Sequence, residues 1–256
     1  MEFEGRVIIR DLSCEMARGK ISVVLGGSGS GKTTLLRLMA GLLEPTAGRI
    51  LVDGEDITRL SETRRAAVRR KIGMMFQAGA LLDSMTVFEN VALPLREHSS
   101  MSRLHVTEVV DDRLREVDLL DIEDLGPKQI SGGMVKRAAL ARAIIEGPPI
   151  LLCDEPFSGL DPVSTRRIEA LLIALNQRHG MTMVIVSHHV RSTLRMADRI
   201  LLLLPDAIVV GTPRELLQST DPRVVSFLDE DRPFEGRAPE VERLPVLAPR
   251  SKARRR

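Results

Sequence analysis

Gly26-Gly27-Ser28-Gly29-Ser30-Gly31-Lys32-Thr33 is the stretch of this 256-residue chain that decides its fold. An apolar run over residues 21–25 leads into it and a helical pattern over residues 34–40 follows, so the order is strand, glycine-rich loop and helix. Glycines let backbone N–H groups surround a phosphate, and the N-terminus of the helix adds its own unpaired N–H groups. The spacing is that of the phosphate-binding P-loop, which predicts a nucleoside triphosphate ligand.

The side chains of this loop have separate expected tasks. Lys32 is expected to reach the β- and γ-phosphates, and the Thr33 hydroxyl is expected to hold Mg²⁺. The other positions predicted to line the phosphates are Gly26, Gly27, Ser28, Gly29, Ser30, Gly31 and Thr34. A glycine-rich turn before an ordinary helix is the alternative, and the complete set of fixed positions argues against it.

The composition places few restrictions on the fold but excludes some functions. Hydrophobic residues make up 43% and charged residues 28%, which is typical of a globular chain. No apolar run approaches the roughly 20 residues that cross a bilayer, so a membrane role would need a separate spanning chain. With two cysteines, Cys14 and Cys153, the expected compartment is a reducing cytosol. The absence of Trp and Tyr removes base-stacking platforms and argues against a nucleic-acid partner.

Two adjacent carboxylates, Asp154 and Glu155, end an apolar strand that includes Cys153, an expected core residue. A P-loop needs a carboxylate opposite it for the Mg²⁺ shell and a base that aligns or deprotonates the attacking water. Ligands of open α/β sheets bind at the carboxyl ends of the strands, where this pair lies. We therefore assign Asp154 to the metal shell and Glu155 to the base; an Asp-Glu pair on the surface is the alternative.

Strands and helices alternate along most of the chain, which predicts a parallel α/β sheet covered on both faces. Residues 1–78 and 147–217 are the expected nucleotide-binding core, and residues 79–146 a helical insert. From residue 218 the periodic pattern gives way to Pro, Arg and acidic residues, so 218–256 is expected to be a C-terminal extension ending in a basic tail. The expected strands cover residues 6–16, 48–57, 72–76, 150–154, 183–187 and 200–204.

A second phosphate cradle is predicted about a hundred residues after the first. Ser131-Gly132-Gly133 precedes a helical pattern over residues 135–145, so it offers N–H groups and a positive helix end to an anion. One nucleotide needs one such cradle, so each chain would give the second cradle to the nucleotide of a partner. Two identical chains about a twofold axis would then enclose two ATP molecules. A Ser-Gly-Gly helix start with no ligand is the alternative.

The content and order of these motifs resemble the ATPase subunit of ABC transporters over nearly the whole chain, to about residue 217. The resemblance implies a P-loop NTPase core of ABC ATPase type, with an antiparallel β subdomain and an inserted α-helical subdomain. It implies ATP and Mg²⁺ as cofactors and hydrolysis of ATP as the activity. It assigns Gln77 to a contact with Mg²⁺ and γ-phosphate, and Ser131-Gly132-Gly133 to the signature that reaches the partner's ATP. A silent cassette is disfavoured because every catalytic position is filled.

Two further roles follow from the same resemblance. Asp161, just after the strand that ends in the two carboxylates, corresponds to the residue that reaches across the dimer. His188, after a later apolar strand, corresponds to the switch histidine that contacts the γ-phosphate, although His189 follows it where the family usually has Asp. Ile130 opens the signature where Leu is usual. Phe3 is the only aromatic candidate for stacking on adenine.

The segment after Gln77 narrows the resemblance. Residues 76–82 and 86–98, with 131–134 and 221–228, resemble the ATPase of the Mla/Mce lipid-transport systems, which energises lipid movement between envelope membranes. In that family the segment after Gln77 receives a coupling helix of the permease. The resemblance implies an integral-membrane permease, Mce-type lipid-binding subunits and a peripheral place on the cytoplasmic face of the bacterial inner membrane. It also implies a C-terminal extension that embraces the partner ATPase.

Two alternatives remain open from the sequence. The chain could serve an ABC transporter for another class of substrate, since the permease and its binding proteins choose the cargo. It could instead be a soluble ABC-type ATPase acting on DNA or ribosomes. Such proteins usually carry two cassettes in one chain, or long coiled-coil or zinc insertions, and the sequence has neither.

Overall fold

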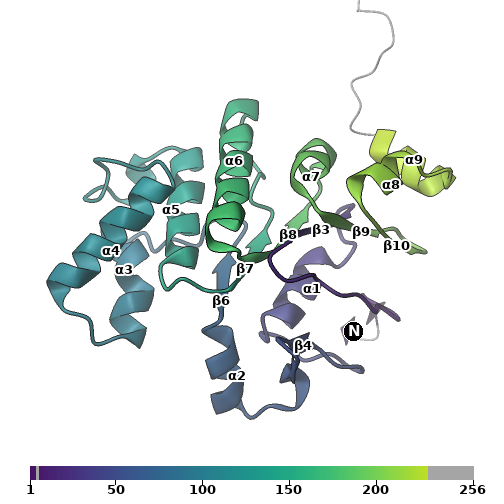
Figure 1. Ribbon diagram of the computed structural model, residues 1–256, viewed down its shortest axis with the longest axis horizontal. Coiled ribbons are helices and arrows are strands. Elements are labelled where there is room, and N and C mark those ends of the chain that lie inside the picture. Colours follow the sequence, from purple (N-terminus) through teal and green to yellow (C-terminus); the bar gives the residue numbers. More distant parts are fainter. Residues whose placement is uncertain (4–5, 230–256) are drawn as a thin grey trace, which may run out of the picture.

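A computed structural model describes residues 1–3 and 6–229 of the chain. At its centre is a six-stranded sheet with the strand order β10-β9-β3-β8-β7-β6 (Figure 1). The strands are β3 (Ile21–Gly26), β6 (Ile72–Met75), β7 (Ile150–Asp154), β8 (Thr182–Ser187), β9 (Arg199–Leu203) and β10 (Ile208–Gly211). All neighbouring pairs are parallel except β9 and β10. The predicted α/β fold with a P-loop between strand and helix is confirmed.

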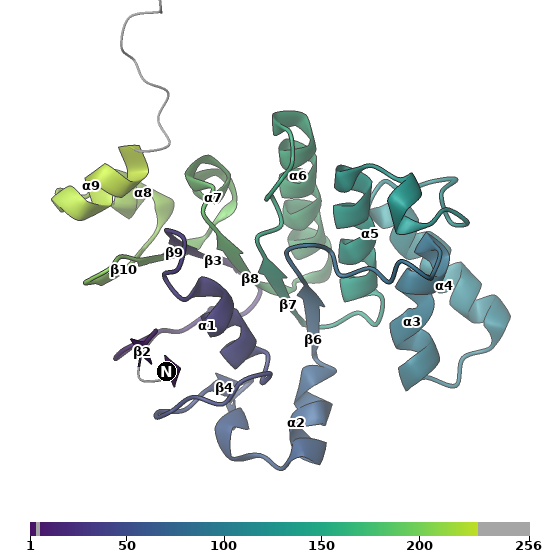
Figure 2. The same cartoon turned by 180° about the vertical axis from the view of Figure 1, so that it is seen from behind.

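Helices cover both faces of this sheet because alternate residues of a buried strand point to opposite sides. Val23 packs into the hydrophobic cluster that contains the buried side of α6 (Pro162–His179). Its neighbour Val24 packs into the cluster that contains α1 (Lys32–Met39). Figure 2 shows the resulting layers, with α1 and α6 on opposite sides of the strands.

Three helices form an insert between β6 and β7 at one end of the sheet. They are α3 (Val87–His98), α4 (Arg103–Glu116) and α5 (Gly132–Ile144). Thr86 begins α3 with a capping box: its hydroxyl accepts the N–H of Glu89, and the Glu89 carboxylate accepts the N–H of Thr86. Buried side chains of the insert join those of the sheet in one cluster. The insert therefore packs onto the sheet as a continuation of the core.

The strand predicted over residues 6–16 is mostly wrong. Only β2 (Arg6–Val7) is extended there, and it pairs antiparallel with β1 (Glu2–Phe3). Asp11 has a φ of 49°, in the left-handed region, which interrupts an extended chain. The apolar side chains of Ile9, Leu12 and Met16 still pack on the core. The apolar pattern of this segment therefore predicted its burial correctly but not its pairing with another strand.

The single strand predicted over residues 48–57 is a hairpin. Strands β4 (Leu51–Val52) and β5 (Glu55–Asp56) pair antiparallel around Asp53 and Gly54. These two residues have φ angles of 51° and 81°, as a type I′ turn requires. A short 3₁₀ helix (Ile57–Arg59) and α2 (Glu62–Arg69) follow. The two small antiparallel sheets form the β subdomain that the family resemblance implied.

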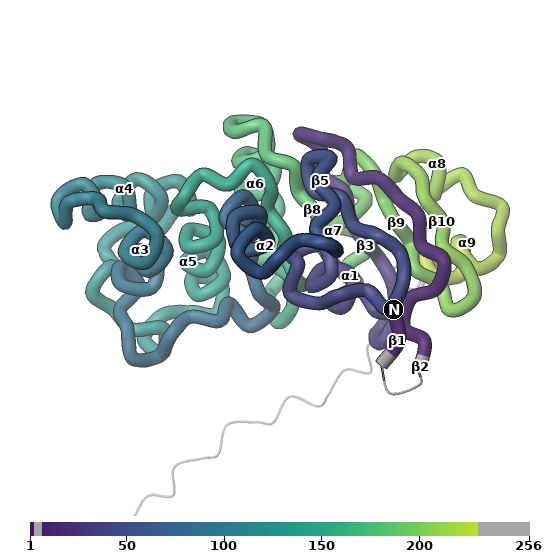
Figure 3. The backbone as a smooth tube through the Cα atoms, turned by 90° about the horizontal axis from the view of Figure 1, so that it is seen from below, coloured from purple at the N-terminus to yellow at the C-terminus, as the bar shows by residue number. Residues whose placement is uncertain are grey.

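Three short helices complete the part of the chain that the structure describes, and two of them, α8 and α9, lie at the end of the molecule opposite the insert (Figure 3). They are α7 (Val190–Met196), α8 (Pro213–Leu217) and α9 (Pro222–Asp229). Val224 and Leu228 of α9 are buried against β9, so the extension predicted from residue 218 begins with a packed helix. Residues 230–256, with the basic tail, lie outside the described residues. None of the described helices combines the length and apolar character that crossing a bilayer needs.

Candidate active site

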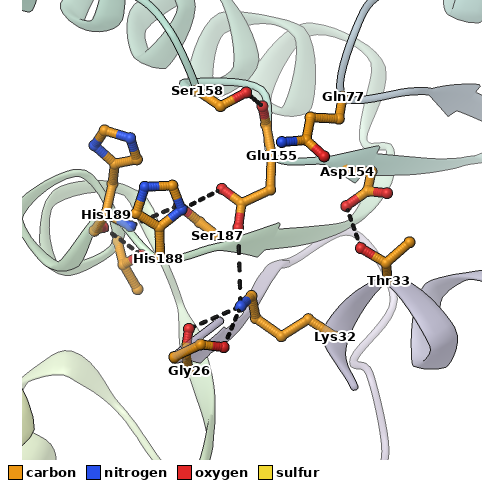
Figure 4. Close-up of polar contacts among 12 residues, drawn as sticks. Gly26, Lys32, Thr33, Gln77, Asp154, Glu155, Ser158, Ser187, His188 and His189 are labelled. Atoms are coloured by element: carbon orange, nitrogen blue, oxygen red, sulfur yellow. Dashed lines mark hydrogen bonds and ion pairs between the residues drawn. The ribbon is translucent and has the colours of Figure 1, made fainter. Parts of the chain in front are cut away.

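Four neighbouring parallel strands end at one edge of the sheet, and each supplies a candidate residue there. Strands β3, β8, β7 and β6 are consecutive in the sheet and run in the same direction. The P-loop follows β3, Glu155 follows β7, His188 follows β8 and Gln77 lies just beyond β6. Because parallel strands place their carboxyl ends together, residues far apart in the sequence meet here (Figure 4).

The loop between β3 and α1 has the shape of a phosphate cradle. Gly31 precedes α1 with a φ of 91°, and a Cβ there would meet Ile8 at 2.9 Å. A Cβ on Gly26 would lie 2.8 Å from the carbonyl oxygen of Leu203. The buried hydroxyl of Ser30 has no hydrogen-bond partner among the described residues. A tight loop at a helix N-terminus with an unsatisfied hydroxyl fits a phosphate ligand.

The remaining predicted loop positions differ in exposure. Gly27, Ser28 and Gly29 are exposed at the tip of the loop, whereas Thr34 is half-buried in the first turn of α1. The exposed tip leaves room for a ligand on the side away from the sheet. The predicted phosphate contacts of these four residues stay predictions.

Lys32 lies inside the cradle and is bonded to its own loop. Its Nζ donates to the carbonyl oxygens of Gly26 and Gly27, each at 2.8 Å, and lies 3.9 Å from the Glu155 carboxylate. Burial lowers the pKa of Lys32, and the negative charges of Glu155 and Asp154 oppose that effect. A cation of this kind can exchange its carbonyl partners for phosphate oxygens.

Thr33 and Asp154 form the oxygen pair expected at a metal site. The Thr33 hydroxyl donates to Oδ1 of Asp154 at 3.0 Å, across the gap between α1 and β7. Burial raises the pKa of Asp154, and the hydrogen bond from Thr33 opposes that effect. In Figure 4 the Gln77 side chain points toward the carboxylates that follow β7. A buried carboxylate and a hydroxyl suit Mg²⁺, which takes few protein ligands beside phosphates and water.

Glu155 has the backbone of a functional position. Its φ is 48°, and a left-handed conformation costs a residue with a side chain about 1–3 kcal/mol. Its N–H donates to the carbonyl of Val186 at 2.9 Å, which ties the turn to β8. His188 Nδ1 lies 2.8 Å from Oε2 of Glu155, which is an ion-pair distance, and that buried oxygen accepts no further hydrogen bond from the described residues.

The two adjacent histidines have different surroundings. The His188 imidazole faces the carboxylate of Glu155. His189 packs edge-on against the Phe157 ring, with ring centroids 5.9 Å apart, and its N–H donates to the Ser187 hydroxyl at 2.9 Å. The contact of the His188 imidazole with the candidate base favours His188 as the switch residue.

The second predicted cradle lies apart from this cluster, at the start of α5. Ser131 caps the helix by accepting the N–H of Met134 at 3.3 Å, and α5 begins at Gly132 rather than near residue 135 as predicted. Ser131 and Gly132 are exposed, and nothing lies within 4 Å of a Cβ built on Gly132. Along the length of the molecule in Figure 1, α5 lies on one side of α6 and α1 on the other, and this turn begins α5 whereas the P-loop precedes α1.

Asp161 lies next to that exposed turn. It caps α6 by accepting the N–H groups of Val163 and Ser164 at 2.8 and 3.0 Å. Hydrogen bonds from Ser164 keep the pKa of Asp161 below its ordinary value. A Cβ on Gly133 would lie 3.2 Å from the Ser164 hydroxyl. The signature turn and Asp161 therefore form one surface. The side chain of Phe3 lies outside the described part of the chain, and its stacking on adenine stays a prediction.

Sequence reasoning missed Lys136, a lysine on α5 that is only 6% exposed. Its Nζ donates to the main-chain carbonyls of Gln77 and Glu155 and to the hydroxyl of Ser158. A lysine in a helix usually lies in solvent. Because two of its three partners are main-chain carbonyls, which every residue has, no sequence pattern could have identified them.

The sequence profile of the ABC transporter family matches residues 9–158, more than half of the chain. This chain belongs to the ABC transporter family. The family membership confirms the resemblance drawn from the motifs, and with it the ATP-binding and ATP-hydrolysing character of the chain.

Curated relatives of this ABC protein include two named MlaF, the ATP-binding protein of the intermembrane phospholipid transport system. The chain described here is 44% identical to MlaF of Haemophilus influenzae over 224 residues, which cover 87% of this chain and 85% of MlaF. The chain is also 44% identical to MlaF of Escherichia coli, over 88% of this chain and 84% of MlaF. The probable ribonucleotide transport ATP-binding protein mkl of Mycobacterium leprae is 41% identical over 90% of this chain and 67% of mkl.

Solved structures of ABC cassettes have the same fold. The dimeric cassette MJ0796 with ADP and Pi bound aligns with a TM-score of 0.75 and 31% identity, over 81% of this chain and 91% of that one. The cassette cbiO1 of Clostridium perfringens, part of the cbiONQ transporter complex, aligns with a TM-score of 0.77 and 26% identity, over 89% and 90% of the two chains. These likenesses confirm the ABC ATPase fold predicted for this chain.

Proposed function

We propose that this ABC ATPase energises phospholipid transport between envelope membranes, from the cytoplasmic face of a bacterial inner membrane and through a separate permease. The 44% identity to MlaF over 87% of the chain carries the proposal. The complete set of candidate catalytic residues at one sheet edge supports an active subunit. The likeness to mkl, which is named for ribonucleotide transport, favours another cargo as the second candidate.

Mg²⁺ and the triphosphate of ATP fit the residues at this edge. Thr33 and Asp154 would hold the metal, with Gln77 beside them, and Mg²⁺ would supply neutralisation of the charge on the phosphate oxygens. Among the described residues no three His, Cys, Asp or Glu side chains form a metal site by themselves. The metal would therefore bind together with the nucleotide, which provides the missing oxygens.

Hydrolysis would depend on positioning by the protein's own side chains. Lys32 would balance the charge of the β- and γ-phosphates. Glu155, at the end of β7, would align the attacking water and accept its proton. His188, whose Nδ1 lies 2.8 Å from Oε2 of Glu155, would contact the γ-phosphate and hold the carboxylate in place.

Two copies of the chain would complete each site. The signature turn (Ser131, Gly132 and Gly133) and Asp161 form one exposed surface that is separate from the P-loop of the same chain. In a head-to-tail dimer this surface would face the partner's nucleotide. The description of MJ0796 as a dimer supports this arrangement for a cassette of the same fold. We retain the predicted domains, 1–217 with the insert 79–146 and the extension 218–256, and note that α9 packs on the core.

A groove of about 600 Å³ lies between α2, β6, α3 and α5, beside the segment that follows Gln77. Its lining is partly apolar and carries more basic than acidic side chains. The apolar lining includes Ile72, Met74, Phe76, Leu93 and Pro94, and the charged lining is Arg69, Arg70, Arg142 and Glu146, of which Glu146 lies 3.0 Å from His98. We place the coupling helix of the permease here, because an amphipathic helix with acidic residues would match both parts.

Leu93→Arg should prevent this docking. A charged side chain at the apolar wall would lose the contacts of an incoming helix, and we expect recovery of the permease with the ATPase to fall about tenfold or more. Co-purification from detergent-solubilised membranes measures it. Leu104→Arg, on a leucine that is 72% exposed on α4, is the matched control and should bind normally. Equal recovery with both variants would exclude this groove as the docking site.

The transport function itself is tested by reconstitution. The complex formed with the permease should move labelled phospholipid between vesicles only when ATP is hydrolysed, with Glu155→Gln as the inactive control. Co-purification of Mce-type subunits would support the lipid system. Stimulation of ATP turnover by nucleotides rather than phospholipids would favour the second candidate, and recovery of ribosomes or DNA in place of a permease would contradict both.

A further inference from the structure

Lys136 joins three segments of the chain that are distant in sequence. Its Nζ donates to the carbonyl of Gln77, to the carbonyl of Glu155 at 3.1 Å and to the hydroxyl of Ser158 at 3.3 Å. The Ser158 hydroxyl donates in turn to the carbonyl of Glu155 at 3.0 Å. Burial lowers the pKa of Lys136, and the charges of Glu155 and Asp154 oppose that effect. A buried ammonium with three acceptors is fixed in its place.

These contacts act on the strained residue of the site. Glu155 holds a φ of 48°, which persists only where its surroundings enforce it. Its N–H is bonded to Val186 of β8 at 2.9 Å, and its carbonyl is bonded to Lys136 of α5. The backbone of the candidate base is thus held from both sides, by the sheet and by the helix that follows the signature turn.

The loop that follows β6 is held by the same helix. Arg142 donates to the carbonyls of Gly79 and Ala80 at 2.8 and 2.7 Å. A Cβ on Gly79 would lie 3.1 Å from a methyl group of Val135, so this backbone lies directly against α5. Two cations of one helix therefore bind three carbonyls of this loop, with Lys136 at Gln77 and Arg142 at Gly79 and Ala80.

We propose that Lys136 is a positioning residue for ATP hydrolysis, which holds the Gln77 loop and the Glu155 turn on helix α5. The same helix begins with the exposed signature turn, about one helical turn before Lys136. A displacement of α5 when the turn meets a nucleotide would then move the backbones of Gln77 and Glu155 with it. The inference rests on the proposed roles of these two residues in hydrolysis.

The test compares Lys136→Met with Lys136→Arg in the full-length protein. The methionine keeps the aliphatic stem and removes the donors, whereas the arginine keeps a cation with several donors. We expect Lys136→Met to lower kcat for ATP about tenfold or more with KM changed less than about threefold, because misplacement affects chemistry rather than binding. Lys136→Arg should recover most of the lost turnover.

Amide hydrogen exchange gives a second readout, measured on residues 77–80 and 155–158. Both segments should exchange faster in Lys136→Met than in the parent, with residues 27–31 of the P-loop unchanged. Lys128→Met removes a lysine whose side chain is 79% exposed in the same insert and should match the parent in every measurement. Equal turnover in Lys136→Met and the parent, or no recovery in Lys136→Arg, would overturn the proposal.

A folding defect does not remove the test. If Lys136→Met fails to fold, Ser158→Ala deletes one acceptor of the lysine and must still raise exchange over residues 155–158; unchanged exchange overturns the proposal. Glu155→Gln separates this inference from the proposed catalytic roles. Normal turnover in Glu155→Gln would refute the base assignment, whereas an inactive Glu155→Gln beside a fully active Lys136→Met would refute only the positioning role.

Discussion

Glu155→Gln is expected to lower the turnover of ATP about a hundredfold to ten-thousandfold, because the amide cannot accept a proton from the attacking water. The affinity for ATP should stay within about threefold of the parent, since Glu155 follows β7 and the phosphate cradle is built by the β3–α1 loop. Single-turnover hydrolysis and equilibrium nucleotide binding on the same preparation measure the two quantities separately.

A control variant is available on the surface of the insert. Glu108→Gln alters a carboxylate whose side chain is 63% exposed on α4 and should hydrolyse ATP at the parental rate. The left-handed backbone of residue 155 suits Gln no worse than Glu, so the variant should fold and melt like the parent. Undiminished turnover in Glu155→Gln would remove this residue from the role of base.

Lys32→Ala is expected to weaken ATP binding about a hundredfold. The variant removes the ammonium group of Lys32, whose Nζ lies inside the cradle, 2.8 Å from the carbonyls of Gly26 and Gly27. In the complex, Nζ would instead donate two hydrogen bonds to phosphate oxygens of ATP. Hydrogen bonds of a charged donor contribute about 1.5 kcal/mol each at the lower limit, or about 3 kcal/mol together. Equilibrium titration with ATP, at fixed free Mg²⁺, gives the change in Kd.

Lys20→Ala is the matched control for this loss. Lys20 has a side chain that is 57% exposed, and its Nζ lies 3.3 Å from Asp198, away from the cradle. A Kd for ATP that is the same in Lys32→Ala and in the parent would contradict the P-loop assignment. A loss of turnover without a loss of affinity would instead restrict Lys32 to the stabilisation of the transition state.

Local patterns were sufficient to predict the parts of the fold that place the site. The apolar runs that end at Gly26, Asp154 and Ser187 each became a buried parallel strand, because only a continuous apolar run can be buried on both faces. Because parallel strands of one sheet place their carboxyl ends at the same edge, the residues that follow these three strands lie close together regardless of the fold of the intervening segments. This is why the sequence alone was enough to predict that Lys32 and Glu155 lie close together.

Features that depend on the backbone or on distant packing were not predictable. The strand expected over residues 48–57 turns back at Asp53 and Gly54, and only the observed pairing shows that a second strand returns beyond this turn. The two glycines at 132 and 133 hid the true start of α5, because glycine disfavours a helix and the Ser131 cap compensates. The packing of α9 depends on its contact with β9, which no local pattern describes.

Cys153 of β7 is completely buried behind Asp154, and burial raises the pKa of its thiol to about 12. The only other cysteine, Cys14, is exposed. Because the thiolate is the form that reacts with a maleimide, the native protein offers the reagent one sulfur atom. A second label, counted by mass spectrometry, can then attach only to molecules whose central strands have separated, so the chain has an intrinsic chemical reporter of global opening.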